Sequence, residues 1–151
     1  MRALIVGGGI GGLAAAVALQ RVGITAAIFE KAPQITEVGA GLSLWSNAMV
    51  ALRRLGLDAA ALEAASVIER TRTFLFSGES FGSVDFAALT EKAGAPSICL
   101  HRATLQRLLL DAALYDDPRS VQTAENARVL RRMPLRLQLS SPTEQESTGM
   151  C

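Results

Sequence analysis

Residues 3–12 read ALIVGGGIGG, and this stretch decides the fold. The first four residues are aliphatic or β-branched, which is typical of a buried strand in a parallel sheet. Glycine dominates the next six, and residues 13–22 are good helix formers. Glycines are unfavourable inside a helix but suit a tight turn between a strand and a helix. The stretch therefore predicts a strand, a turn and a helix in succession.

A second strand and an acidic residue extend this pattern. Gly7, Gly9 and Gly12 form G-x-G-x-x-G, residues 26–29 read AAIF, and Glu30 follows them. In such a unit the first glycine permits the tight turn and the second lets the backbone approach a pyrophosphate. The third glycine lets the helix pack closely on the strand. Glu30 follows the glycine motif at about the spacing expected of a residue that binds ribose hydroxyls.

These elements predict a dinucleotide-binding site. The backbone amides of Ile10, Gly11 and Gly12 stand at the start of the helix, where they point at phosphates and the helix dipole favours negative charge. A carboxylate at Glu30 accepts hydrogen bonds from free ribose hydroxyls and repels a 2′-phosphate. The pattern therefore favours the AMP half of FAD or of NAD over NADP. It leaves the choice between FAD and NAD open.

Composition excludes several other classes of protein. The chain has 151 residues and a formal net charge of +1, which fits one domain and argues against a nucleic-acid binder. Residues 3–19 carry no charge, but their five glycines argue against a signal peptide or a membrane span. The two cysteines fit a reducing cytoplasm. Nothing predicts a metal site or a catalytic side chain.

The rest of the chain predicts further helices and strands. Ser46 is expected to cap a helix over residues 47–55. The other expected elements are a short helix at 58–65, a β-hairpin within 67–86, a strand at 98–100 and a helix at 103–115. We therefore expect an α/β, Rossmann-like fold: a parallel sheet with helices, incomplete, in which residues 67–100 begin a β-rich insertion.

Three blocks carry a resemblance to a known family. They read GGGIGGLAAAVALQRVGITAAIFEKAP (7–33), EVGAGLSLWSNAMVALRRLGL (37–57) and HRATLQRLLLDAA (101–113). Over roughly residues 1–115 the chain resembles the N-terminal part of FAD-dependent monooxygenases of the aromatic-ring hydroxylase type, with the salicylate-hydroxylase-like branch the most similar. The blocks occur in the family's order, which is more specific than any one of them alone.

The resemblance implies further cofactor-binding residues. The glycines would serve the FAD pyrophosphate, Glu30 the adenosine ribose, and Lys31 would lie beside the adenine end. Gly41 would pass close to the ribityl chain and the flavin ring. Arg102 would contact the phosphate or ribityl region, and Gln106, one helical turn later, would add a polar contact.

The resemblance also implies an activity and a departure from it. In the family the flavin is reduced by NADH or NADPH and reacts with oxygen to hydroxylate an aromatic or similar small molecule. The family carries an Asp-Gly motif and a Gly-Asp motif later in its sequence, and this chain contains neither dipeptide. We therefore expect FAD binding by an N-terminal part that does not hydroxylate alone. The alternatives are an NAD-binding oxidoreductase module and a folding fragment without a ligand.

The composition changes after Pro118. Residues 128–136 are rich in arginine, and a polar stretch follows. One strand is expected near Val121, and the last dozen residues are expected to be disordered. We divide the chain into an FAD-binding region, 1–117, and a divergent, poorly ordered tail, 118–151. A truncated gene, or a frameshift near residues 118–130, is our hypothesis for the change in composition.

Overall fold

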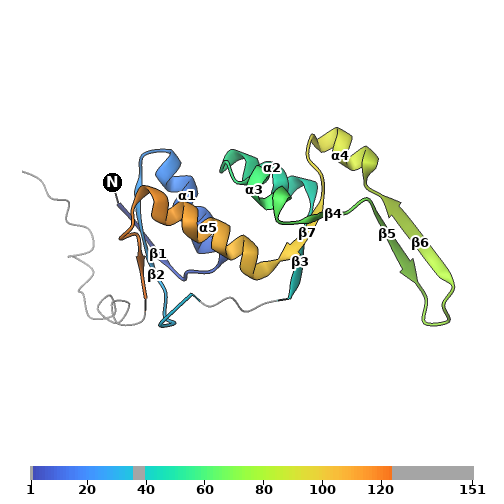
Figure 1. Ribbon diagram of the computed structural model, residues 1–151, viewed down its shortest axis with the longest axis horizontal. Helices are drawn as coiled ribbons and strands as arrows, with labels where there is room; N and C mark the ends of the chain where they lie inside the picture. Colours follow the sequence, from blue (N-terminus) through green and yellow to red (C-terminus); the bar gives the residue numbers. More distant parts are fainter. Residues whose placement is uncertain (1, 36–39, 124–151) are drawn as a thin grey trace, which may run out of the picture.

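The computed structural model describes residues 2–35 and 40–123, shown in colour in Figure 1. Residues 1, 36–39 and 124–151 lie outside the described part. The predicted disorder of the last dozen residues therefore falls outside it as well. The elements follow this order: β1 (Arg2–Val6), α1 (Ile10–Arg21), β2 (Thr25–Phe29), β3 (Gly41–Leu44), α2 (Ser46–Arg54), α3 (Asp58–Glu63), β4 (Ser66–Val67), β5 (Arg70–Phe74), β6 (Ser80–Asp85), α4 (Ala87–Ala93), β7 (Ile98–His101), α5 (Arg102–Asp116) and β8 (Val121–Gln122).

A parallel sheet with the strand order β1-β2-β8 forms one end of the molecule. Strand β2 pairs with β1 along its whole length and with β8 at Ile28 and Phe29. Helices α1 and α5 lie side by side over one face of this sheet (Figure 1). Their apolar sides and β2 share one core, which contains Leu13, Ala16, Val17, Ala26, Ile28, Leu105, Leu109 and Ala113. The predicted Rossmann-like α/β fold is confirmed, and β8 adds a strand from beyond Pro118.

A second, antiparallel sheet has the strand order β3-β7-β4. Its central strand buries Ile98 and Leu100, while Met49 and Leu52 of α2 and Ala61 of α3 join the same core. Burial of this apolar surface is the main force that holds α2 and α3 on the sheet.

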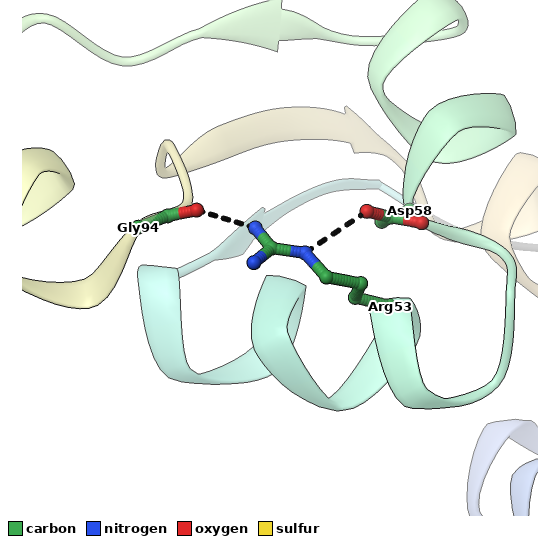
Figure 2. A network of polar contacts seen from close by, with 3 residues as sticks. All are labelled: Arg53, Asp58 and Gly94. Atoms are coloured by element: carbon green, nitrogen blue, oxygen red, sulfur yellow. Dashed lines mark hydrogen bonds and ion pairs between the residues drawn. The ribbon is translucent and has the colours of Figure 1, made fainter.

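A polar network joins the ends of three helices. The guanidinium of Arg53, near the end of α2, donates to Oδ2 of Asp58, 3.2 Å away at the start of α3, and to the carbonyl oxygen of Gly94 after α4. Figure 2 shows the side chain lying between these two acceptors. The cation therefore satisfies a carbonyl at one helix end, where a positive charge is favoured by the helix dipole.

The predicted hairpin is formed by β5 and β6, and it projects away from the helices (Figure 1). All residues of β6 are exposed. Across the two strands Arg70 and Asp85 form an exposed ion pair of 3.0 Å. The turn lies at Gly78, whose φ of +86° favours glycine.

The expected cap at Ser46 is wrong. Helix α2 begins at Ser46 itself, Trp45 is the N-cap residue, and no side chain caps the helix. The Ser46 hydroxyl is buried and lies 3.2 Å from the hydroxyl of Ser97, in the segment that leads into β7. The serine therefore links α2 to a distant part of the chain instead of closing its own helix.

Candidate nucleotide-binding site

The glycine-rich loop connects β1 to α1 and folds as its spacing predicts. Gly7 has a φ of +108°, and its amide donates to the carbonyl of Phe29 at 2.8 Å. A Cβ at Gly12 would overlap the carbonyl oxygen of Gly7, so only glycine permits this approach of helix to strand. A Cβ at Gly9 or Gly11 would have no neighbour within 4 Å. The space beside these two residues is open among the described residues.

The N-terminus of α1 offers free donors beside this space. Gly9 is the N-cap residue, no side chain caps the helix, and its first turn holds no acidic residue. The first backbone bond of the helix runs from the Leu13 amide to the Gly9 carbonyl at 2.9 Å. The amides of Ile10, Gly11 and Gly12 precede that bond and have no carbonyl of the helix to bind. Such an end favours an anion.

Glu30 lies directly against the glycine loop. Its Oε2 accepts a hydrogen bond from the Gly8 amide at 2.7 Å, and its Oε1 accepts one from the Ala32 amide at 2.9 Å. These bonds, that of Ala32 first, lower the pKa of the Glu30 carboxyl below its usual value, and the positive charge of Lys31 acts in the same direction. The carboxylate is therefore ionised at neutral pH. Lys31 itself is exposed.

Helix α5 brings a side chain to the same loop from the far end of the chain. Nε2 of Gln106 donates to the carbonyl oxygen of Gly8 at 3.2 Å. Arg102, one helical turn earlier, is exposed, and its backbone amide donates to the carbonyl of Ala40 at 3.2 Å. Gly41 lies opposite His101 in the pairing of β3 with β7. The starts of β3 and α5 are therefore neighbours.

The structure thus brings the predicted residues into one connected series. Glu30 contacts Gly8, Gly8 contacts Gln106, and Arg102 stands one turn before Gln106 on α5, next to Ala40. The residue that the motif did not single out is Gly8, which is buried at the centre of this series. A signal in the sequence was the middle one of the three consecutive glycines at 7–9, since G-x-G-x-x-G leaves that position free.

Metal-binding clusters and membrane-spanning helices are both absent from the part of the chain that the structure describes. Residues 2–35 and 40–123 contain no group of three or more His, Cys, Asp or Glu side chains that could hold a metal ion. In the same residues no helix combines the length and the apolar character needed to cross a membrane.

Fold and site together define a dinucleotide-binding α/β domain. A strand, a glycine turn, a helix with free N-terminal amides and an acid at the end of the second strand are its components. Residues 1–132 match the family model described as FAD binding domain, and the chain belongs to this family. Its cofactor is FAD, which settles the choice that the glycine pattern leaves open.

Curated relatives include a monooxygenase/isomerase and an FAD-dependent hydroxylase. The chain is 45% identical over 106 residues to an aurachin C monooxygenase/isomerase of Stigmatella aurantiaca, which covers 70% of this chain and 28% of the relative. It is 37% identical over 112 residues to an FAD-dependent urate hydroxylase of Klebsiella pneumoniae, covering 74% of this chain and 29% of that protein. The chain therefore spans less than a third of the length of these relatives.

Solved structures agree with this assignment. Klebsiella pneumoniae HpxO, solved in complex with FAD and uric acid, superposes with a TM-score of 0.68 at 34% identity, covering 82% of this chain and 31% of that one. A 2-methyl-3-hydroxypyridine-5-carboxylic acid oxygenase superposes with a TM-score of 0.71 at 27% identity and the same coverages. The fold of the described residues is thus that of the FAD-binding part of these oxygenases.

Proposed function

We propose that this chain binds FAD along the series from Glu30 to Gly41. The observation that supports this most directly is the contact of Glu30 with Gly8, because it brings the ribose-binding acid and the phosphate-binding loop together. Glu30 would hold the adenosine ribose, with Lys31 beside the adenine end. The open space at Gly9 and Gly11 fits a pyrophosphate against the start of α1.

The other half of the cofactor would follow α5 toward β3. Arg102 begins α5, one turn from Gln106, and no described residue binds its guanidinium, so this cation is available for a phosphate or ribityl oxygen. Its amide contacts Ala40, next to Gly41, where a backbone without a side chain allows the ribityl chain and flavin ring to approach. The order of these residues therefore matches the order of groups in FAD.

The function of the whole protein is proposed on the same basis. Bound FAD supplies the redox chemistry, with NADH or NADPH as electron donor, and this chain's residues bind and orient it. Relatives that act on urate or 3-hydroxybenzoate support a flavin-dependent monooxygenase with a small aromatic or heteroaromatic substrate. We place it in the cytoplasm, consistent with its cysteine content. We also propose 1–117 as the FAD-binding region and 118–151 as a divergent tail, whose first residues contribute β8 to the parallel sheet.

Flavin retention tests the proposal. The purified chain is mixed with FAD, passed through a desalting column, and its visible spectrum is recorded. We expect flavin in the protein peak, and its loss in Gly9→Val, which places a side chain in the open space, and in Glu30→Ala. A folded but colourless wild-type peak would contradict FAD binding, and a colourless aggregate would favour the folding fragment.

A further inference from the structure

The backbone around Gly8 is held on both sides by side chains from distant elements. The Gly8 amide donates to Glu30 at the end of β2, and the Gly8 carbonyl accepts from Gln106 of α5. A Cβ at Gly8 would come within 3.0 Å of Cδ1 of Ile35 and 3.2 Å of the Glu30 Cβ, so the position is also closely packed. Two successive peptide groups, one on each side of Gly8, are thereby fixed.

The second of these peptide groups includes the Gly9 amide. The Gly8 carbonyl and the Gly9 N–H belong to the same peptide unit, and in a trans peptide they point in opposite directions. The described residues contain no cis peptide bond. Because Gln106 draws the Gly8 carbonyl toward α5, the Gly9 N–H points away from α5. No described residue accepts a hydrogen bond from this N–H.

We propose that Gln106 is a positioning residue for the pyrophosphate, acting through the Gly8 carbonyl instead of touching the cofactor. The inference rests on the proposed FAD binding and makes it more specific. The acceptor is a carbonyl oxygen, so the group that Gln106 presents to it must be its NH2. A side chain without an N–H at this position leaves the Gly8–Gly9 peptide free to rotate and the Gly9 amide without a fixed direction.

The chain contains a matched control for this contact. Nε2 of Gln20 on α1 donates to the carbonyl oxygen of Ala113 on α5 at 3.0 Å, the same pair of chemical groups in a contact between α1 and α5. It lies away from the glycine loop, near the other end of α1. Gln106→Met and Gln20→Met each remove one such donor with little change in side-chain volume. Only the first is expected to affect the ligand.

Three ligands separate a positioning role from a direct contact with the flavin half. FAD and ADP both contain the adenosine and the pyrophosphate, ADP lacks the ribityl chain and flavin, and adenosine lacks the pyrophosphate as well. We expect Gln106→Met to raise the Kd of FAD and of ADP by about tenfold, the loss of one hydrogen bond. The Kd of adenosine should stay unchanged, and Gln20→Met should leave all three constants unchanged. Isothermal titration calorimetry on the full 151-residue chain measures them.

Nuclear magnetic resonance of the ligand-free chain gives an independent readout. In a 15N–1H correlation spectrum, Gln106→Met should shift or broaden the Gly9 amide resonance, whereas Gln20→Met should leave it in place. An unchanged Gly9 resonance in Gln106→Met overturns the positioning role, whatever FAD does. A loss of affinity for FAD without a loss for ADP also overturns it, as does an equal loss in Gln20→Met. Wild-type protein that binds neither FAD nor ADP refutes the proposed function instead.

Discussion

The glycine loop and the β5–β6 hairpin are both turns built on a glycine with positive φ, yet their surroundings differ. At the loop, Gly7 (φ +108°) is followed by the buried Gly8, which is bonded to side chains from β2 and α5. At the hairpin, Gly78 (φ +86°) turns a pair of strands whose residues are nearly all exposed, Phe74 and Phe81 among them. The same local chemistry gives a fixed site only where distant elements pack on it.

The largest difference is expected from adding a methyl group in each region. Gly12→Ala places a Cβ on the Gly7 carbonyl, which cannot move without displacing the loop, whereas a Cβ at Gly82 of β6 has no neighbour within 4 Å. We expect Gly12→Ala to lower the free energy of unfolding by about 3 kcal/mol or more, and Gly82→Ala to change it by less than about 0.5 kcal/mol. Urea denaturation followed by circular dichroism measures both. Equal effects would contradict the close helix–strand contact.

A smaller, pH-dependent effect is expected from Glu30. Hydrogen bonds from the Ala32 and Gly8 amides lower its pKa in the folded chain. The unfolded chain therefore takes up this proton first as the pH falls. The stability that Glu30 contributes is present above about pH 4.3 and is lost as the pH falls through the folded-state pKa.

Unfolding curves between pH 3 and pH 7 test this difference in protonation. We expect Glu30→Gln to be less stable than wild type at pH 7, because one of the two amides loses its acceptor, and to lose less stability in acid. Parallel curves for the two proteins would show that the carboxylate makes no such bonds. Asp85 of the hairpin is the carboxylate to compare with Glu30. Hydrogen bonds from the Ala87 amide and from the Arg70 side chain lower the pKa of Asp85 as well.

The smallest effect is expected from the ion pair of the hairpin. Arg70 and Asp85 are 3.0 Å apart, but more than half of each side chain is exposed, so water and salt screen their attraction. We expect Arg70→Ala to leave the thermal midpoint unchanged within experimental error, at both low and high salt. A clear loss of thermal stability that depends on the salt concentration would show that this ion pair stabilises the hairpin.

Local signals predicted much of the fold. The aliphatic run, the glycine spacing and the following acid predicted β1, α1, β2 and Glu30 because each depends on neighbouring residues. The hairpin within 67–86 was predicted in the same way, because its two strands are close in sequence. Local structure depends on residues that are close in sequence, so it can be predicted from the sequence alone.

Contacts between distant residues were not predictable in this way. Ser46 has the residue type of a helix cap, but its hydroxyl contacts Ser97, a partner 51 residues away. Gly8 was left without a role because its two partners, Glu30 and Gln106, are brought to it only by the folded sheet and by α5. Nothing in the glycine pattern itself specifies those contacts.

The separation between Gly8 and Gln106 has a consequence for synthesis on the ribosome. Strands β1 and β2 and helix α1 are contiguous, so Glu30 can meet Gly8 soon after they emerge, while Gln106 follows Gly8 by 98 residues. At usual rates of translation that interval is roughly 5–20 s. Throughout it, Leu13 and Val17 of α1 lack the cover that α5 later gives them. The nascent chain therefore passes through a period in which its first apolar face is open to chaperones.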